Sequence, residues 1–112
     1  MEKTINNEEL MKVVNLLKKD LSDHFGARIE RIILYGSYAR GDYNEDSDVD
    51  IMVLLNDLPV REDEKFVDRL SFDYMYDYTV LFSIMLQVNI KYNIVLDFYP
   101  YYQNIEKEGI MI

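Results

Sequence analysis

The sequence of 112 residues predicts an α+β (or α/β) domain in which helices pack on a small mixed β-sheet. Apolar residues recur at helical spacing near the N-terminus, and two β-branched runs follow on either side of a polar turn. A second helical segment then leads into a third apolar run. No repeat, low-complexity segment or linker interrupts the chain, so we expect residues 1–112 to form a single domain.

The first expected element is a helix over about residues 7–24. Its apolar residues fall on one helical face, namely Leu10, Val13, Val14, Leu16, Leu17 and Leu21. Gly26 follows as the expected C-terminal cap, because glycine adopts the left-handed conformation at low cost. We therefore expect the helix to pack one face against the sheet.

Two strands should follow, over residues 29–35 and about 48–55, because both segments are rich in Ile, Val and Leu. The segment between them, residues 40–47, contains Gly, Asp, Asn and Ser and predicts a turn. After Pro59, the spacing of apolar residues predicts a helix with an acidic first turn that ends near Tyr74. Residues 79–86 predict a third strand, and residues 88–112 predict one or two short helices before an edge strand over 110–112.

Composition excludes several classes of protein. No apolar stretch of membrane-spanning length is present, and the first residues lack the pattern of a signal peptide. Because there is no cysteine, we expect a reducing, cytoplasmic setting. The formal net charge of −9 argues against direct nucleic-acid binding, which needs a basic surface. A protein partner, or a small anion that arrives with a metal ion, fits this charge better.

The most informative residues lie around the polar turn. Asp48 and Asp50 are two apart in a strand, so their side chains should share one face while Val49 and Ile51 point into the core. Two carboxylates a few ångströms apart repel by roughly 2 to 3 kcal/mol, and a divalent cation between them removes that cost. Mg²⁺ or Mn²⁺ would suit these oxygen ligands and would leave coordination positions for phosphate oxygens. Gly36 and Ser37 supply a small-residue loop that a phosphate can approach closely.

The runs Gly36-Ser37-Tyr38-Ala39-Arg40-Gly41 and Ser47-Asp48-Val49-Asp50 resemble the signature of the minimal nucleotidyltransferase (MNT) family, within the DNA polymerase β-like superfamily. The resemblance implies the nucleotidyltransferase fold. It also implies that Gly36 and Ser37 bind the nucleotide phosphates and that Asp48 and Asp50 hold the metal ions. Members transfer a nucleoside monophosphate from a triphosphate, such as ATP, to a hydroxyl. Small members are often encoded beside a HEPN-type ribonuclease toxin and act as its antitoxin.

The sequence departs from this pattern at one position. The family usually carries a third carboxylate on the next strand, where it binds metal and helps to deprotonate the attacking hydroxyl. The segment 79–86 contains no acid, and alignment by strand places Ser83 at that position. Asp77 and Asp97, which flank the strand, are the alternatives. Loss of the acid would weaken general-base assistance, which is usually worth 10² to about 10⁴ in rate.

Two other polar residues have competing interpretations. Arg40 could contact phosphate, or could form an ion pair with Asp42, Asp46 or Asp48 that shapes the turn. His24 is the only histidine and is expected near a helix end, where a surface or dipole role is favoured over catalysis.

Two functional hypotheses follow. The first is a Mg²⁺-dependent enzyme that moves AMP from ATP to a hydroxyl on a HEPN-type partner, as an antitoxin. The second is a catalytically weak or inactive module of the same fold that neutralises the partner by contact. The intact Gly36-Ser37 and Asp48/Asp50 pairs favour the enzyme, whereas Ser83 in place of an acid favours the module. Homo-oligomer formation is left open.

Overall fold

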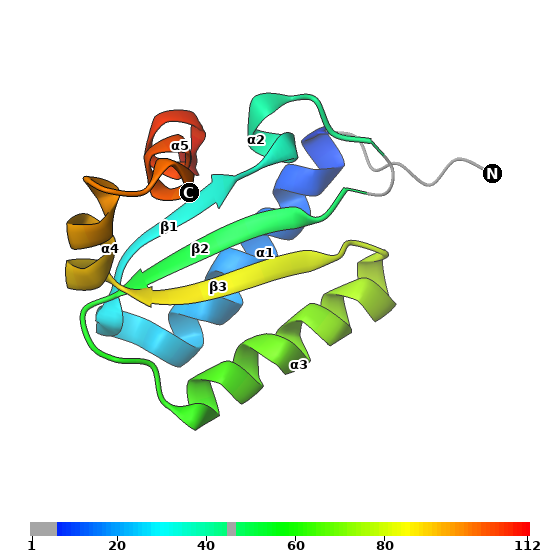
Figure 1. Cartoon of the computed structure of the whole chain (residues 1–112). Helices are drawn as coiled ribbons and strands as arrows, with labels where there is room; N and C mark the ends of the chain where they lie inside the picture. The colour runs from blue at the N-terminus through cyan, green and yellow to red at the C-terminus, as the bar shows by residue number, and fades with distance from the viewer. Residues whose placement is uncertain (1–6, 45–46) are drawn as a thin grey trace.

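The computed structural model describes residues 7–44 and 47–112, which form alternating helices and strands (Figure 1). In chain order the elements are α1 (Asn7–Phe25), the 3-10 turn η1 (Gly26–Arg28), β1 (Ile29–Tyr35), α2 (Ser37–Arg40), β2 (Val49–Leu55), α3 (Arg61–Tyr78), β3 (Phe82–Val88), α4 (Asn89–Leu96), α5 (Pro100–Glu108) and β4 (Ile110–Met111). None of the helices in these two ranges combines the length and apolarity needed to cross a bilayer.

The strands form one mixed sheet in the order β3-β2-β1-β4. Strand β2 runs antiparallel to β1 and parallel to β3, and β4 pairs antiparallel with the other edge of β1. The parallel pair requires a crossover, which α3 supplies. The predicted class, a small mixed sheet with helices packed on it, is confirmed.

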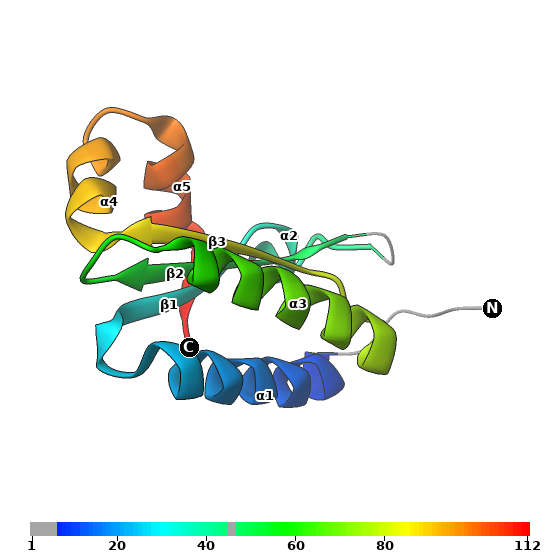
Figure 2. The ribbon, with the colours of Figure 1, turned by 90° about the horizontal axis from the view of Figure 1, so that it is seen from below.

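Helices cover both faces of this sheet (Figure 2). Helices α1 and α3 lie on one face, and α4 and α5 lie on the other. Strand β2 alternates between the two layers: Ile51 and Val53 belong to the α1/α3 core, whereas Met52 and Leu54 belong to the smaller α4/α5 core. Because β2 is buried on both faces, its sequence is apolar throughout, except at Asp50.

Polar contacts fix the second layer on the sheet. The phenol of the fully buried Tyr92 donates to Glu106 Oε1 at 2.8 Å. The Arg31 guanidinium, from β1, donates to both oxygens of the same carboxylate at 3.1 and 3.2 Å. Together with the buried Ile105, these contacts hold α5 against β1.

Two expected boundaries were wrong. Helix α3 continues to Tyr78 rather than ending near Tyr74, and β3 begins at Phe82 rather than at Thr79. The rings of Tyr74 and Tyr78 stack at 5.4 Å one turn apart, and the Tyr74 phenol donates to Asp20 on α1 at 2.6 Å. These contacts extend the helix, and Thr79 ends it in the left-handed conformation (φ 59°). The β-branched residues after Tyr78 therefore cap the helix and connect it to β3 instead of starting the strand.

Elsewhere the expected elements are present, with one addition. Residues 88–112 form two short helices and a two-residue edge strand. Gly26 has φ 55°, as a helix cap requires, although it opens η1 instead of a plain loop. The short helix α2 was not expected, because four residues are too few to show helical periodicity.

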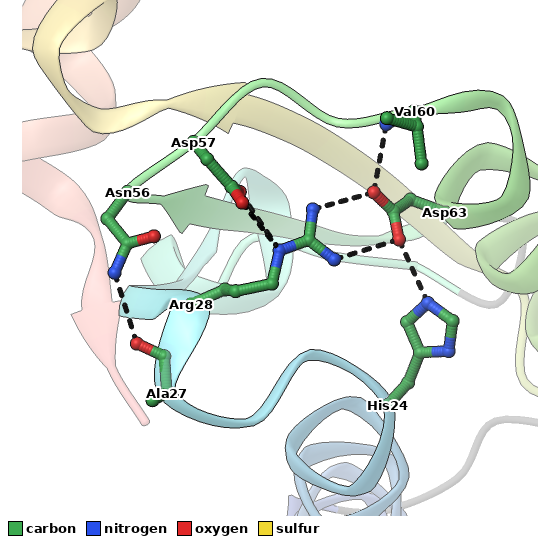
Figure 3. Close-up of polar contacts among 7 residues, drawn as sticks. All are labelled: His24, Ala27, Arg28, Asn56, Asp57, Val60 and Asp63. Atoms are coloured by element: carbon green, nitrogen blue, oxygen red, sulfur yellow. Dashed lines mark hydrogen bonds and ion pairs between the residues drawn. The ribbon is translucent and has the colours of Figure 1, made fainter.

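A charged network ties α1, η1 and α3 together at the end of the sheet where β1 begins (Figure 3). The Arg28 guanidinium donates to both oxygens of the buried Asp63, at 2.7 and 3.1 Å. The Val60 N–H donates to the same carboxylate at 2.9 Å, and His24 Nε2 lies 3.0 Å from it. Since His24 also stacks on Phe66 at 4.0 Å, its role is structural. These hydrogen bonds, led by those of Arg28, hold the pKa of Asp63 well below its ordinary value.

Replacing Asp63 with Asn should lower the free energy of unfolding by about 2 to 4 kcal/mol at pH 7, because a buried partner of Arg28 loses its charge. Urea denaturation measures this change. The control is Asp57→Asn, since Asp57 pairs with the same guanidinium at 2.9 Å while its own side chain is 53% exposed. Its loss should cost about 1 kcal/mol or less. Equal losses in both variants would contradict a special role for Asp63.

The stabilisation by Asp63 should depend on pH. An unfolded Asp has a pKa of about 3.9, and the folded pKa of Asp63 is lower. The network's contribution is therefore fully present above about pH 5 and is lost as the pH falls through 4 toward the folded pKa. Wild type and Asp63→Asn should converge in stability over this range, as measured by thermal unfolding between pH 7 and 3.

Candidate active site

The junction between β1 and α2 brings the backbone close to a carboxylate. Gly36 has φ 79°, in the left-handed region that favours glycine. Its carbonyl accepts hydrogen bonds from the N–H groups of Ala39 and Arg40, both at 3.1 Å, which starts α2. A Cβ atom at Gly36 would overlap the Asp50 carboxylate. Glycine is therefore required here both for the turn and for the close approach of Asp50.

Asp48 and Asp50 lie at the start of β2. Val49 and Ile51 are 1% and 0% exposed and point into the α1/α3 core. Asp50 is half-buried on the opposite face, and Asp48, just before the strand, is exposed. Burial, and then the charge of Asp48, raise the pKa of Asp50 above its ordinary value, against the opposing effect of Arg40. The two carboxylates thus interact unfavourably when both are ionised, which a cation between them would relieve.

Strand register places Ser83 directly beside Asp50. The parallel pairing of β2 with β3 joins these two residues. The acidic alternatives lie elsewhere: Asp77 is in the last turn of α3 and Asp97 caps α4. Within the ranges 7–44 and 47–112, no three acidic, His or Cys side chains gather closely enough to hold a metal ion. The site therefore has a carboxylate pair with a hydroxyl beside it.

These residues open onto a cleft of about 550 Å³. Its walls come from the end of β1, from α2, from the start of β2 and from α5; the lining residues are Tyr35, Gly36, Ser37, Arg40, Asp50, Tyr101, Asn104, Ile105 and Glu108. Four of the five residues expected at the site, namely Gly36, Ser37, Arg40 and Asp50, thus share one cleft. Asp48, two residues before Asp50, is not part of the lining.

Arg40 has contacts on both sides of this cleft. Its Nε donates to Asp42 at 3.2 Å, which fits the expectation of an ion pair within the turn. Its Nη1 also reaches Glu108 Oε1 on α5 at 3.5 Å. Of the other two acids considered, Asp46 lies outside the described residues, and Asp48 forms no ion pair with Arg40 in the part of the chain that the structure describes. Arg40 is therefore both an ion-pair partner and a cation at the cleft wall.

The contribution of α5 was not foreseen from the sequence. Tyr101, Asn104 and Glu108 recur at helical spacing and line the cleft opposite α2. That spacing is visible in the sequence, but it is the same as that of an ordinary solvent-facing stripe. Only the packing of α5 on β1 shows which side of the helix faces the site.

The donor set fits a divalent cation that is held jointly with a phosphate. Mg²⁺ commonly takes one or two protein carboxylates and completes its shell with water and phosphate oxygens. Asp48 and Asp50 would supply these carboxylates, and their mutual repulsion when both are ionised would favour a cation between them. Among the described residues, the Ser37 hydroxyl at the neighbouring wall makes no hydrogen bond, so it is free to meet a phosphate.

Comparison with known proteins identifies the family of this chain. A family model described as a nucleotidyltransferase domain matches residues 14–108. A "Putative protein adenylyltransferase" of Methanocaldococcus jannaschii is 36% identical over 75 residues, which cover 67% of this chain and 76% of the relative. The protein adenylyltransferase MntA of Thermococcus cleftensis is 44% identical over 52 residues, which cover 46% of this chain and 50% of that protein.

A solved structure shows the same fold. The crystal structure of the toxin–antitoxin pair MntA–HpeT superposes with a TM-score of 0.59 and 20% identity, over 97% of this chain and 72% of the matched one. Sequence and fold thus agree. The chain belongs to the nucleotidyltransferase domain family of enzymes, and within it to the minimal nucleotidyltransferases.

Proposed function

We propose that this protein is a Mg²⁺-dependent adenylyltransferase that moves AMP from ATP to a hydroxyl on a partner protein. The observation that carries the proposal is the cleft in which Gly36, Ser37 and Asp50 meet. A loop open to phosphate beside a carboxylate pair is the arrangement that nucleotidyl transfer requires, because positioning and charge neutralisation dominate that reaction. Relatives named as protein adenylyltransferases support AMP as the group transferred.

Each residue has a defined role in this proposal. Asp48 and Asp50 hold Mg²⁺ (or Mn²⁺), and the ion neutralises the charge of the triphosphate when bound. Gly36, which has no side chain, leaves room for the Asp50 carboxylate. The Ser37 hydroxyl donates a hydrogen bond to a phosphate oxygen. Arg40 supplies positive charge at the same wall, although it must share its guanidinium with Asp42 and Glu108.

The acceptor and the biological role form the second part of this proposal. We assign the acceptor hydroxyl to a second protein, of the HEPN toxin type, for which this chain acts as antitoxin. Relatives named as protein adenylyltransferases support a protein acceptor. The structural similarity to a toxin–antitoxin pair supports a protein partner.

One observation favours a second function. Ser83 lies beside Asp50 where an acid would assist deprotonation of the attacking hydroxyl. Without that acid, nucleotide and metal binding would persist while transfer slowed. A binding module that neutralises its partner by contact is thus the alternative.

Incubation with Mg²⁺, α-labelled ATP and a purified HEPN-type protein separates the two functions. Transfer predicts labelled partner protein, detected by autoradiography and mass spectrometry, and loss of label with Asp50→Asn. A stable complex that carries no label would instead establish the binding module.

Changing Asp48 and Asp50 together to Asn should abolish Mg²⁺-dependent ATP binding, because the cation loses both charged ligands. Isothermal titration calorimetry with and without Mg²⁺ measures this. The matched controls are Asp77→Asn and Asp97→Asn, since neither residue lines the cleft. Both controls should bind as wild type does. Loss of binding in either control, with no loss in the double variant, would show that the metal ion binds elsewhere in the protein.

Replacing Ser83 with Asp should create a three-carboxylate site beside Asp50. Added repulsion should lower the melting temperature without metal, and Mn²⁺ should restore it, because the ion gains a ligand. We expect Mn²⁺ to bind about tenfold more tightly, as measured by electron paramagnetic resonance. Ser83→Asn, of similar size and neutral, is the control. Equal Mn²⁺ affinities in both variants would show that position 83 does not reach the ion.

A further inference from the structure

One wall of the cleft has no role in phosphate or metal binding. Residues Tyr101, Asn104 and Glu108 of α5 face the cleft opposite Gly36 and Ser37. A nucleoside is covalently joined to its phosphates, so a nucleotide held at Gly36 and Ser37 has α5 as the remaining wall against which its base can lie. The chemistry of this wall therefore bears on which base is accepted.

Helix α5 is held firmly enough to act as a recognition surface. The phenol oxygens of Tyr101 and Tyr35 lie 3.2 Å apart, and their rings meet edge to face at 6.4 Å. Ile105, the neighbour of Asn104, is 3% exposed in the core between α5 and the sheet. These contacts hold the segment of α5 that carries Asn104 in place against the sheet.

Asn104 is the cleft residue of α5 with free hydrogen-bonding capacity. The Tyr101 phenol already contacts Tyr35, and Glu108 already contacts Arg40. Within residues 7–44 and 47–112, the Asn104 side chain makes no hydrogen bond, although it lines the cleft. Its amide offers one carbonyl acceptor and two N–H donors.

We propose that Asn104 forms hydrogen bonds to the nucleobase, with Tyr101 beside it as an aromatic surface for the base, and that its amide is what admits adenine. This inference rests on the proposed nucleotidyltransferase function and assigns its base contact to one side chain. An asparagine amide can pair with adenine through two hydrogen bonds, accepting from N6–H and donating to a ring nitrogen. On the corresponding edge of guanine the amide can accept from N1–H and donate to O6, so it admits either purine, whereas a side chain that only accepts hydrogen bonds would discriminate between them.

The substitution Asn104→Asp tests this assignment through a change in preference. A carboxylate can only accept, so it opposes the ring nitrogen of adenine but can accept two hydrogen bonds from the N1–H and N2–H groups of guanine. The ratio of ATP to GTP affinity should therefore fall by about tenfold or more. Isothermal titration calorimetry of the full chain with Mg²⁺ and each nucleoside triphosphate measures the ratio. General repulsion between the new charge and the phosphates weakens both nucleotides alike and cancels in this ratio.

The matched control is Gln103→Glu, the same amide-to-carboxylate change at the neighbouring position, which is exposed and outside the cleft. It should leave the ratio unchanged. If wild type binds nucleotide but the ratio is unchanged in Asn104→Asp, Asn104 does not contact the base, while the proposed nucleotidyltransferase function stands. A change confined to the preference for ATP over dATP would place Asn104 at the ribose and would also overturn the assignment. Failure of wild type to bind any nucleotide would overturn the proposed function itself.

Discussion

Strand β2 must be buried on both faces, and most of the architecture follows from that constraint. Ile51 and Val53 need the α1/α3 layer, and Met52 and Leu54 need the α4/α5 layer. Full burial of each such side chain is worth about 1.5 to 3 kcal/mol, so removal of either layer would expose a costly surface. A slip of one residue would also exchange the two faces and drive the Asp50 carboxylate into the larger core. The packing that stabilises the fold therefore also orients the site.

Acidic side chains have opposite environments near the two ends of β1. Near its first residue, the Asp63 carboxylate of α3 accepts hydrogen bonds from Arg28 and Val60, which favour its ionised form. Near its last residue, the Asp50 carboxylate of β2 packs against Gly36 with the charge of Asp48 nearby, and its ionised form is disfavoured. Stability is thus concentrated at one end of the sheet, and unrelieved charge at the other. Natural proteins commonly depart from local optimum at the positions that bind ligands.

Much of this molecule could be predicted from the sequence, for identifiable reasons. Helix α1 and strands β1 and β2 carry long, regular apolar patterns, and the pattern of β2 correctly placed Val49 and Ile51 in the core. Local patterns failed where a distant contact decides the outcome. The end of α3 depends on the bond from Tyr74 to Asp20, and the inward side of α5 depends on Arg31 and Tyr92 holding Glu106. The Gly36 loop and the acids were recognisable in sequence, whereas Asn104 became visible only as part of the cleft.

The pairing of β4 with β1 has a consequence for the order of folding. Ile33 and Leu34 pair with Met111 and Ile110, across most of the length of the chain. Contacts so distant in sequence require a large loop closure, which tends to place them late in folding, after the local α1–β1–β2 unit has formed. Helix α5 precedes β4 directly and supplies one wall of the cleft. The carboxylate end of the cleft would therefore be assembled first, and a folding intermediate without α5 would hold the carboxylates without the wall that faces them.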